Sequence, residues 1–289
     1  MNYEGNLIRP PSEANSIILQ VTVGCAYNKC TFCGAYKDIS YGLKSKDTIE
    51  KDISFAKMYC HRQARLFLAD GDVLMLQQNY LVDLLVRIRK ELPWVKRVSL
   101  YGSAQGIESK TANELNELKL LGLDRVYMGL ESGCDEVLKK VQKAGTAQFI
   151  VNAGKKIGAA GIFLSVTILL GLAGQKGSEQ HAKLTAKALG EIAPQQIAAL
   201  TLMPLENTAL GGDVRRGVFK VLGPEAILTE LHTLIEHLNV QRAQFYANHA
   251  SNYLPLSGRL PKNKHVLLAI IESALAGKKS LVSEQMRTL

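Results

Sequence analysis

Several residue types are scarce in this 289-residue sequence, and each scarcity excludes a class of protein. There are five cysteines, one tryptophan and 6% aromatic residues. The longest apolar stretch, GIFLSVTILLGLAG, is too short to cross a bilayer, so we expect no membrane association. The N-terminal residues lack the basic and apolar segments of a secretory signal. An odd number of cysteines without such a signal argues against a disulfide framework and predicts a cytoplasmic protein.

The composition is that of a globular protein with a positive charge. Hydrophobic residues make up 47% of the chain, and 35 Lys and Arg against 26 Asp and Glu give a net charge of +9. Such a balance can attract nucleic acid or anionic small molecules. No RNP, helix-turn-helix or zinc-finger pattern and no run of five like charges is present, so a small-molecule substrate is favoured over RNA.

Apolar, β-branched runs alternate with segments that have helical spacing. Strands are expected at 16–24, 65–70, 97–103, 124–132, 161–172 and 196–203. Helices are expected between them at 44–59, 76–92, 109–122, 146–161 and 177–192. This alternation predicts parallel βαβ units, either in an open sheet or in a barrel, with the site at the carboxyl ends of the strands. The absence of an early GxGxxG motif argues against a dinucleotide-binding fold.

The alternation stops after residue 204. We therefore expect a core over residues 1–205 and an extension over 206–289 that packs on it and caps the substrate site. The extension should contain helices at 223–239 and 264–275, a short strand at 243–249, and a stretch, 246–261, that is neither helix nor regular strand. In that stretch, substrate contacts or an ordinary loop held by its own turns are about equally favoured. The polar residues concerned are Asn248, His249, Ser251, Asn252 and Tyr253.

Arg215 and Arg216 are candidates for binding an anionic substrate. Adjacent residues on one helix point in different directions, so at most one of them is expected to do so, and we select Arg215.

Three of the five cysteines lie within nine residues, as Cys25, Cys30 and Cys33 in a C-x4-C-x2-C pattern. Short loops of this kind bring soft sulfur ligands to one metal centre. Zinc would want a fourth short-spaced ligand, whereas Cys60 and Cys134 lie alone. A [4Fe–4S] cluster held by three cysteines leaves one iron open for a small molecule. The iron–sulfur interpretation is favoured over zinc, and both over three buried thiols.

The cysteine loop, with Phe32 before its last cysteine, resembles that of the radical S-adenosylmethionine (SAM) superfamily. The usual signature there is C-x3-C-x2-C, so this loop has one extra residue. Four further motifs follow in the superfamily's order over about the first 210 residues. DGD at 70–72 resembles its GGE element, and GLES at 129–132 resembles a segment of the coproporphyrinogen dehydrogenase-like and Elongator-like branches. TILLGLAG at 167–174 and TLMP at 201–204 match its fifth and sixth strands.

This resemblance implies a fold, two cofactors and a set of ligands. The fold would be α/β, a partial (β/α)6 TIM-like barrel with a C-terminal helical and loop extension. A [4Fe–4S] cluster would be bound by the three cysteines, and SAM would be bound beside it, with Lys143 where a basic residue often meets the SAM carboxylate. An external electron donor of the flavodoxin or ferredoxin type is also implied. The implied cofactor-binding residues are Phe32, Asp70, Gly71, Asp72, Ser103, Glu131, Ser132, Lys143, Gly171 and Met203.

The implied reaction is reductive cleavage of SAM to a 5′-deoxyadenosyl radical that takes hydrogen from a substrate. No catalytic residue is assigned; the candidates are His249, Tyr253 and Cys134. Cys134 is expected at a helix N-terminus, where a thiol pKa can fall, although a small residue beside a cap is the simpler interpretation. Two other functions stay open: a non-catalytic haem or iron–sulfur carrier of the haem-chaperone type, and a tRNA-modifying radical SAM enzyme.

Overall fold

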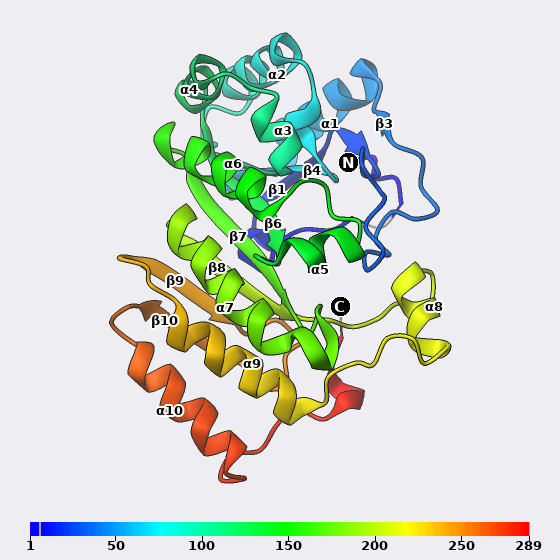
Figure 1. Ribbon diagram of the computed structural model, residues 1–289. Helices are drawn as coiled ribbons and strands as arrows, with labels where there is room; N and C mark the ends of the chain where they lie inside the picture. Colours follow the sequence, from blue (N-terminus) through cyan, green and yellow to red (C-terminus); the bar gives the residue numbers. More distant parts are fainter. Residues whose placement is uncertain (6, 289) are drawn as a thin grey trace. The chain divides into compact units, whose positions relative to one another are not determined.

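The computed structural model describes residues 1–5 and 7–288 (Figure 1). Among these residues, eight strands form one sheet in the order β1–β4–β5–β6–β7–β8–β9–β10. Neighbouring pairs from β1 to β6 and from β7 to β9 are parallel, and β9 and β10 pair antiparallel. The predicted α/β class is thereby confirmed. The strands are β1 (Ile17–Gln20), β4 (Arg65–Ala69), β5 (Arg97–Tyr101), β6 (Leu123–Glu131), β7 (Phe163–Leu170), β8 (Gln196–Thr201), β9 (Ala243–Ala247) and β10 (Leu256–Leu260).

The long helices lie where the periodicity predicts them. Thr111 and Glu114 form a capping box at the start of α4, and Ser45 caps α1 by accepting a hydrogen bond from the N–H of Thr48. Three short helices follow strand ends and have too few turns to produce a periodic signal. The helices are α1 (Lys46–Tyr59), α2 (Gln78–Glu91), α3 (Ala104–Glu108), α4 (Ala112–Leu120), α5 (Asp135–Lys140), α6 (Ala147–Ala159), α7 (Gly174–Ile192), α8 (Ala209–Arg215), α9 (Pro224–His237) and α10 (Lys264–Leu275). No helix in the described part of the chain is both long and apolar enough to span a membrane.

The first predicted strand, 16–24, is wrong as a single element. β1 ends at Gln20, and β2 (Thr22–Val23) pairs instead with β3 (Gly42–Leu43) in a separate antiparallel ribbon. Val21 is the point of exchange, because its N–H bonds to Ala69 O in β4 while its own carbonyl accepts from Lys44 N. An apolar run can indicate strand conformation, but it does not show where the hydrogen-bonding partner changes.

The prediction that 246–261 contains no regular strand is also wrong, because β10 occupies its last third. Leu256 and Leu260 are buried while Ser257 and Arg259 are exposed, which is the period-two pattern of an edge strand. Turn-forming residues on both sides outweigh this short alternation in the sequence.

The chain forms two compact units, each with its own core. One comprises residues 1–28, 35–128 and 156–164, and the other comprises 29–34, 129–155 and 165–289. The first contains edge-to-face contacts among Phe67, Tyr101 and Tyr127. In the second, β9 extends the strand array of β7 and β8. The predicted division at residue 205 stays a prediction.

Candidate functional site

The DGD turn packs against the start of the cysteine loop. A Cβ atom on Gly71 would lie 2.3 Å from the carbonyl oxygen of Gly24 and 2.7 Å from Cys25 Cα. These are backbone atoms, so no side-chain rotation could relieve the overlap. Glycine at position 71 is therefore needed for the turn after β4 to approach Cys25 this closely.

The Asp70 carboxylate holds both flanks of the cysteine loop. It accepts hydrogen bonds from the Tyr36 hydroxyl at 2.7 Å and from Gln20 Nε2 at 3.0 Å, and another from the backbone N–H of Gly24. Burial raises the pKa of Asp70, and these hydrogen bonds oppose that shift. These hydrogen bonds make Asp70 a positioning residue for the cysteine loop, and its predicted contact with SAM stays a prediction.

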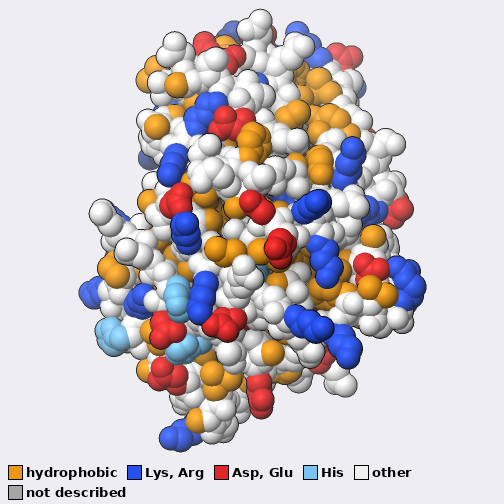
Figure 2. All heavy atoms as spheres, viewed as in Figure 1, with side chains coloured by type: hydrophobic (Ala, Val, Ile, Leu, Met, Phe, Trp, Pro, Cys, Tyr) orange, Lys and Arg blue, Asp and Glu red, His pale blue; other side chains and the backbone are white. Residues whose placement is uncertain are grey.

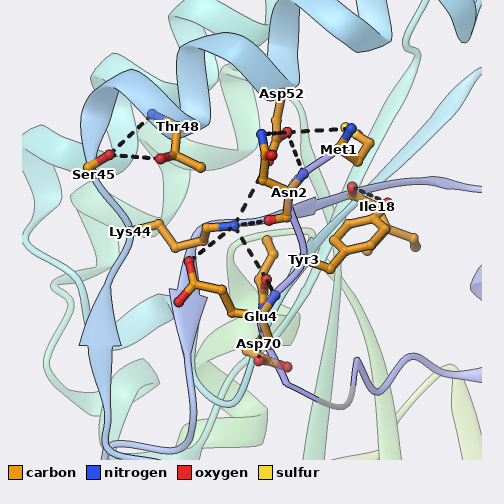
Figure 3. Close-up of polar contacts among 11 residues, drawn as sticks. Met1, Asn2, Tyr3, Glu4, Ile18, Lys44, Ser45, Thr48, Asp52 and Asp70 are labelled. Atoms are coloured by element: carbon orange, nitrogen blue, oxygen red, sulfur yellow. Dashed lines mark hydrogen bonds and ion pairs between the residues drawn. The ribbon is translucent and has the colours of Figure 1, made fainter.

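A buried network around Lys44 fixes Gln20 in turn; Figure 3 shows Lys44, Asn2 and Asp52 in this network. Lys44 is 5% exposed, and its Nζ lies 3.5 Å from Gln20 Oε1 and 4.0 Å from Asp52 Oδ2. Asp52 also accepts hydrogen bonds from the backbone and side-chain nitrogens of Asn2. The buried ammonium is therefore paired, which is the condition for its burial to be tolerated.

The extra residue of the C-x4-C spacing lies in a tethered turn. Asn28 adopts a left-handed conformation, with φ of 42°, which asparagine tolerates better than most residues. Its Nδ2 donates to the Tyr36 carbonyl at 2.6 Å, and Lys37 Nζ donates to the Asn28 carbonyl at 2.8 Å. The turn at Asn28 thus accommodates the longer spacing. It is bound to the segment after Cys33, whose Tyr36 hydroxyl also donates to Asp70.

Asp72 and Ser103, both predicted to bind SAM, lie in contact. Asp72 Oδ1 accepts from Ser103 N at 3.1 Å, and Ser103 Oγ accepts from Gly106 N at 3.0 Å as the cap of α3. A carboxylate oxygen can accept more than one hydrogen bond, and the Ser103 hydroxyl retains its donor. Their SAM contacts stay a prediction.

In the second unit, backbone hydrogen bonds hold the segment that carries Cys30 and Cys33. Thr31 N donates to Val141 O at the end of α5, and Thr31 O accepts from Leu210 N in α8, both at 2.9 Å. Phe32 packs on a core cluster that includes Val141, Leu210 and Phe219. Phe32 thus anchors the segment through apolar contacts, while both thiols stay partly exposed.

The predicted SAM residues Glu131 and Lys143 form an ion pair of 3.1 Å. A Cβ on Gly129 would lie 2.0 Å from Glu131 Oε1 and 3.0 Å from Lys143 Nζ, so the pair occupies space that only glycine leaves free. Burial lowers the pKa of Lys143, but Glu131 and the thiols of Cys30 and Cys33 outweigh it, and the pKa is raised. The charged form of Lys143 is therefore favoured by Glu131 and by the two cysteines.

Ser132 and Cys134, two further predicted residues, make contacts inside the folded protein. Ser132 is buried, and its hydroxyl accepts from Cys134 N at 3.0 Å in the turn that starts α5. Cys134 itself lies in the apolar core cluster, as the simpler interpretation of this residue expects. Its predicted catalytic role stays untested.

Gly171, after β7, is bound by a glutamate from a distant helix. Its N–H donates at 2.7 Å to Glu230 Oε1, and Glu230 in α9 also accepts from the Ser178 hydroxyl and contacts His181 Nδ1 at 3.1 Å. Gly171 has φ of 81°, which favours glycine. Met203 is partly exposed just after β8.

The polar loop 248–254 is docked on the end of β8. Asn252 bonds through its amide to Thr201 Oγ1 at 2.8 Å and Ala199 O at 2.9 Å, and Ser251 Oγ accepts from Thr201 N at 3.1 Å. These contacts make Ser251 and Asn252 anchors of the loop. Asn248 is exposed and His249 half-buried, so these two are the members of the set best placed for a ligand.

Tyr253 is held by the segment that precedes the chain's last described residues. Its hydroxyl donates to Glu284 Oε2 at 2.6 Å, and the Arg287 guanidinium stacks on its ring at 3.8 Å. Burial, with the hydrogen bond to Glu284, raises the pKa of Tyr253 to about 12. The phenol is therefore neutral at physiological pH. A contact between Tyr253 and substrate stays a prediction.

Arg215 and Arg216 have different hydrogen-bond partners. Arg216 forms a 2.6 Å ion pair with Asp213, whereas Arg215 donates only to the backbone carbonyl of Glu206. The Arg215 charge has no carboxylate partner within the described residues.

His249 makes the stability of the folded protein depend on pH. Burial lowers its pKa, and Nδ1 accepts from Ser251 N at 3.1 Å, an arrangement that requires the neutral ring. The unfolded chain, with a histidine pKa of about 6.5, binds protons first as the pH falls. We therefore expect the free energy of unfolding to decrease as the pH falls below about 6.5. In urea titrations of wild type and His249→Gln at pH 7.5 and 5.5, the variant should lose less stability; equal losses would contradict this.

Comparison with known proteins shows the family. A model described as the radical SAM superfamily matches residues 19–184, more than half of the chain. The chain belongs to the radical SAM superfamily. It is 26% identical over 172 residues to 4′-phospho-dehydrooxetanocin synthase of Priestia megaterium, covering 54% of this chain and 23% of that protein. It therefore spans about a quarter of this curated relative.

Solved structures of radical SAM enzymes share the fold. Methylornithine synthase superposes with a TM-score of 0.56 at 16% identity, covering 93% of this chain and 75% of that protein. Coproporphyrinogen III oxidase from Escherichia coli superposes with a TM-score of 0.55 at 16% identity, covering 76% and 51%. These matches confirm the predicted radical SAM type of partial barrel, and membership of the family bears out the prediction of a [4Fe–4S] cluster and SAM as cofactors.

The residues of this radical SAM chain fit an anionic iron–sulfur centre. Cys25, Cys30 and Cys33 are partly exposed thiols outside any disulfide, and the last two contribute to the raised pKa of Lys143. Within the described residues, no three His, Cys, Asp or Glu side chains converge as ligands of a single metal ion. A [4Fe–4S] cluster would instead be held by one thiolate from each of the three cysteines.

Three residues that the sequence did not reveal position predicted site residues within their own units. Tyr36, Lys44 and Glu230 each contact a predicted site residue, or its anchor, from far along the chain. No motif or fixed spacing connects them to their partners. The one available signal was the density of polar and aromatic residues just after Cys33.

Proposed function

We propose that this chain binds a [4Fe–4S] cluster through Cys25, Cys30 and Cys33 and uses it to cleave SAM reductively, generating a radical that acts on a small molecule. The observation that carries the proposal is the Lys143 ammonium, held by Glu131 beside Cys30 and Cys33. It would offset the negative charge of thiolates and cluster. When bound, the cofactors supply one-electron cleavage of the S–C5′ bond, giving methionine and a 5′-deoxyadenosyl radical that takes a hydrogen atom from substrate.

The other predicted residues would bind and orient SAM. Asp72 and Ser103, already in contact at 3.1 Å, would present a carboxylate oxygen and a hydroxyl donor to its polar groups. Glu131 would share its carboxylate between Lys143 and SAM, and Gly171 and Met203 would contact the adenine. At the loop 248–254, the neutral His249 ring would offer its Nε2–H as an uncharged donor, and the Tyr253 hydroxyl, which donates to Glu284, would offer its oxygen as an acceptor.

The substrate class follows from charge and from the curated relative. The relative's name describes a phosphorylated product, and this chain carries a net charge of +9 with Arg215 lacking a carboxylate partner. We infer an anionic small molecule as substrate.

The test is anaerobic reconstitution with iron and sulfide, followed by addition of SAM and dithionite and assay of 5′-deoxyadenosine. We expect about four irons per chain and slow deoxyadenosine release even without substrate. Zinc in place of iron, or a reduced cluster that never cleaves SAM, would contradict the proposal. Stoichiometric haem binding without cleavage would instead support a carrier.

A further inference from the structure

We propose that Asn207 is a positioning residue for Cys33, and that the segment entering α8 thereby helps to hold the iron–sulfur cluster. This inference rests on the proposed cluster at the three cysteines of the loop. We call residues 205–211 the clamp segment; it comprises the turn before α8 and the first residues of that helix. The sequence predicts only a cap over the substrate in this part of the chain, so a place in the cofactor site is a second role for it.

The residue after Cys33 is in contact with the side chain of Asn207. Asn207 Nδ2 donates a hydrogen bond to the carbonyl oxygen of Gly34 at 3.0 Å. A Cβ atom on Gly34 would lie 2.4 Å from Asn207 Oδ1 and 2.7 Å from Leu205 Cδ1. Glycine at position 34 therefore leaves the space in which the Asn207 amide lies, and that amide binds the backbone of the same glycine.

The clamp segment also contacts the residues before Cys33. Leu210 N donates to Thr31 O at 2.9 Å, and Phe32 packs on the core cluster to which Leu210 belongs. Cys33 thus lies between two tethered neighbours, Phe32 and Gly34, and all of these residues belong to one compact unit. The thiol of Cys33 stays partly exposed. The backbone of this ligand is therefore held while its sulfur is left open to a cluster.

The clamp segment is itself a tightly closed turn. The Thr208 hydroxyl donates to Leu205 O at 2.7 Å and accepts from Gly211 N at 3.0 Å. A Cβ atom on Gly211 would lie 2.0 Å from Leu205 O, so glycine is needed for this closure. The backbone that carries Asn207 is therefore ordered by local contacts.

The Asn207 side chain lies at the surface of the protein. It is exposed, and Figure 2 shows charged side chains over the region where Figure 1 labels α8. Replacing it leaves the apolar core intact, whereas loss of its hydrogen bond frees the backbone after Cys33. The entropy that this backbone gains has to be lost again when the cluster binds, and this cost weakens cluster retention.

The experiment measures how fast the anaerobically reconstituted protein loses its cluster absorbance after addition of EDTA. Asn207→Ala should lose the cluster about 3- to 10-fold faster than wild type, which is the effect expected from one hydrogen bond. The EPR signal of the dithionite-reduced cluster should also change, because the Cys33 ligand has shifted. An unchanged signal would leave only a contribution to fold stability and would overturn the positioning role.

The matched control is Asn263→Ala. This asparagine lies in the same unit, and its Oδ1 accepts a hydrogen bond from Arg259 N at 2.9 Å. The control variant should keep the wild-type rate of cluster loss and the wild-type EPR signal. Equal acceleration by Asn263→Ala would reduce the effect to general stability and contradict the proposal.

A double-mutant comparison isolates the contact at Gly34. Gly34→Ala should accelerate cluster loss in the wild-type background, and by a smaller factor in Asn207→Ala, where the overlapping amide is absent. Equal factors would mean that the two residues act independently, against the proposal. If Asn207→Ala does not fold, faster cluster loss in Gly34→Ala alone tests the contact.

The same measurements separate this inference from the proposed function. If wild type binds no iron–sulfur cluster, the proposed function fails and the positioning role fails with it. If wild type holds a cluster and cleaves SAM, but Asn207→Ala retains its cluster as long as wild type does, the positioning role alone is overturned.

Discussion

Replacement of Cys30 with alanine is expected to remove the iron–sulfur absorbance and lower deoxyadenosine formation to the level of a blank. Cys30 lies in the segment fixed by Thr31 to α5 and α8, beside the Lys143 ammonium, and no other thiol is held in that segment except Cys33. With one thiolate missing, only two protein ligands are left for a cluster that needs three. Iron analysis and the deoxyadenosine assay on the reconstituted variant measure both effects.

Cys60→Ala is the matched control. Cys60 is a partly exposed thiol at the end of α1, remote in sequence from the cysteine loop, and its loss should leave iron content and SAM cleavage intact. If Cys30→Ala kept wild-type iron and activity, or if Cys60→Ala lost them, the assignment of ligands would be wrong.

Gly71→Ala should lower both stability and cluster loading. The added Cβ would overlap the Gly24 carbonyl and Cys25 Cα, so the turn or the start of the cysteine loop has to move. Overpacking of this kind typically costs about 1–3 kcal/mol. Urea unfolding of the cluster-free protein measures the cost, and iron content after reconstitution reports the displacement of Cys25.

Gly42→Ala provides the comparison within the same unit. A Cβ at Gly42 would meet no atom within 4 Å, and its φ is not positive, so its unfolding free energy should stay within about 0.5 kcal/mol of wild type. Equal behaviour of the two variants would show that the close approach at Gly71 is not a constraint on the folded protein.

The strands and long helices could be predicted because burial imposes a period on the sequence itself. The strand β4 is buried along nearly all of its length and is therefore apolar throughout. The start of α4 is marked in the sequence by a capping box. The cysteine loop was predictable for a related reason, since ligands of one centre have to be close in sequence when a short loop supplies them.

The sequence contains no comparable signal for contacts between side chains that are far apart along the chain. The sequence placed Asp70 among SAM ligands, but it could not show that Tyr36 and Gln20 compete for its oxygens. It also treated Glu131 and Lys143 as separate ligands, although they form a pair. Two charged side chains form an ion pair only when the fold brings them close together, and one sequence by itself does not show which of them the fold brings together.

The hydrogen bonds that Asp70 accepts from Gln20, Gly24 and Tyr36 have a thermodynamic consequence for cofactor insertion. Fixing one residue's backbone costs about 1–2 kcal/mol of conformational entropy. Protein contacts hold the flanks of the cysteine loop, so part of that entropy cost belongs to folding and not to cluster binding. The cluster then binds to a preorganised loop, and more of the free energy of the iron–thiolate bonds is retained as affinity.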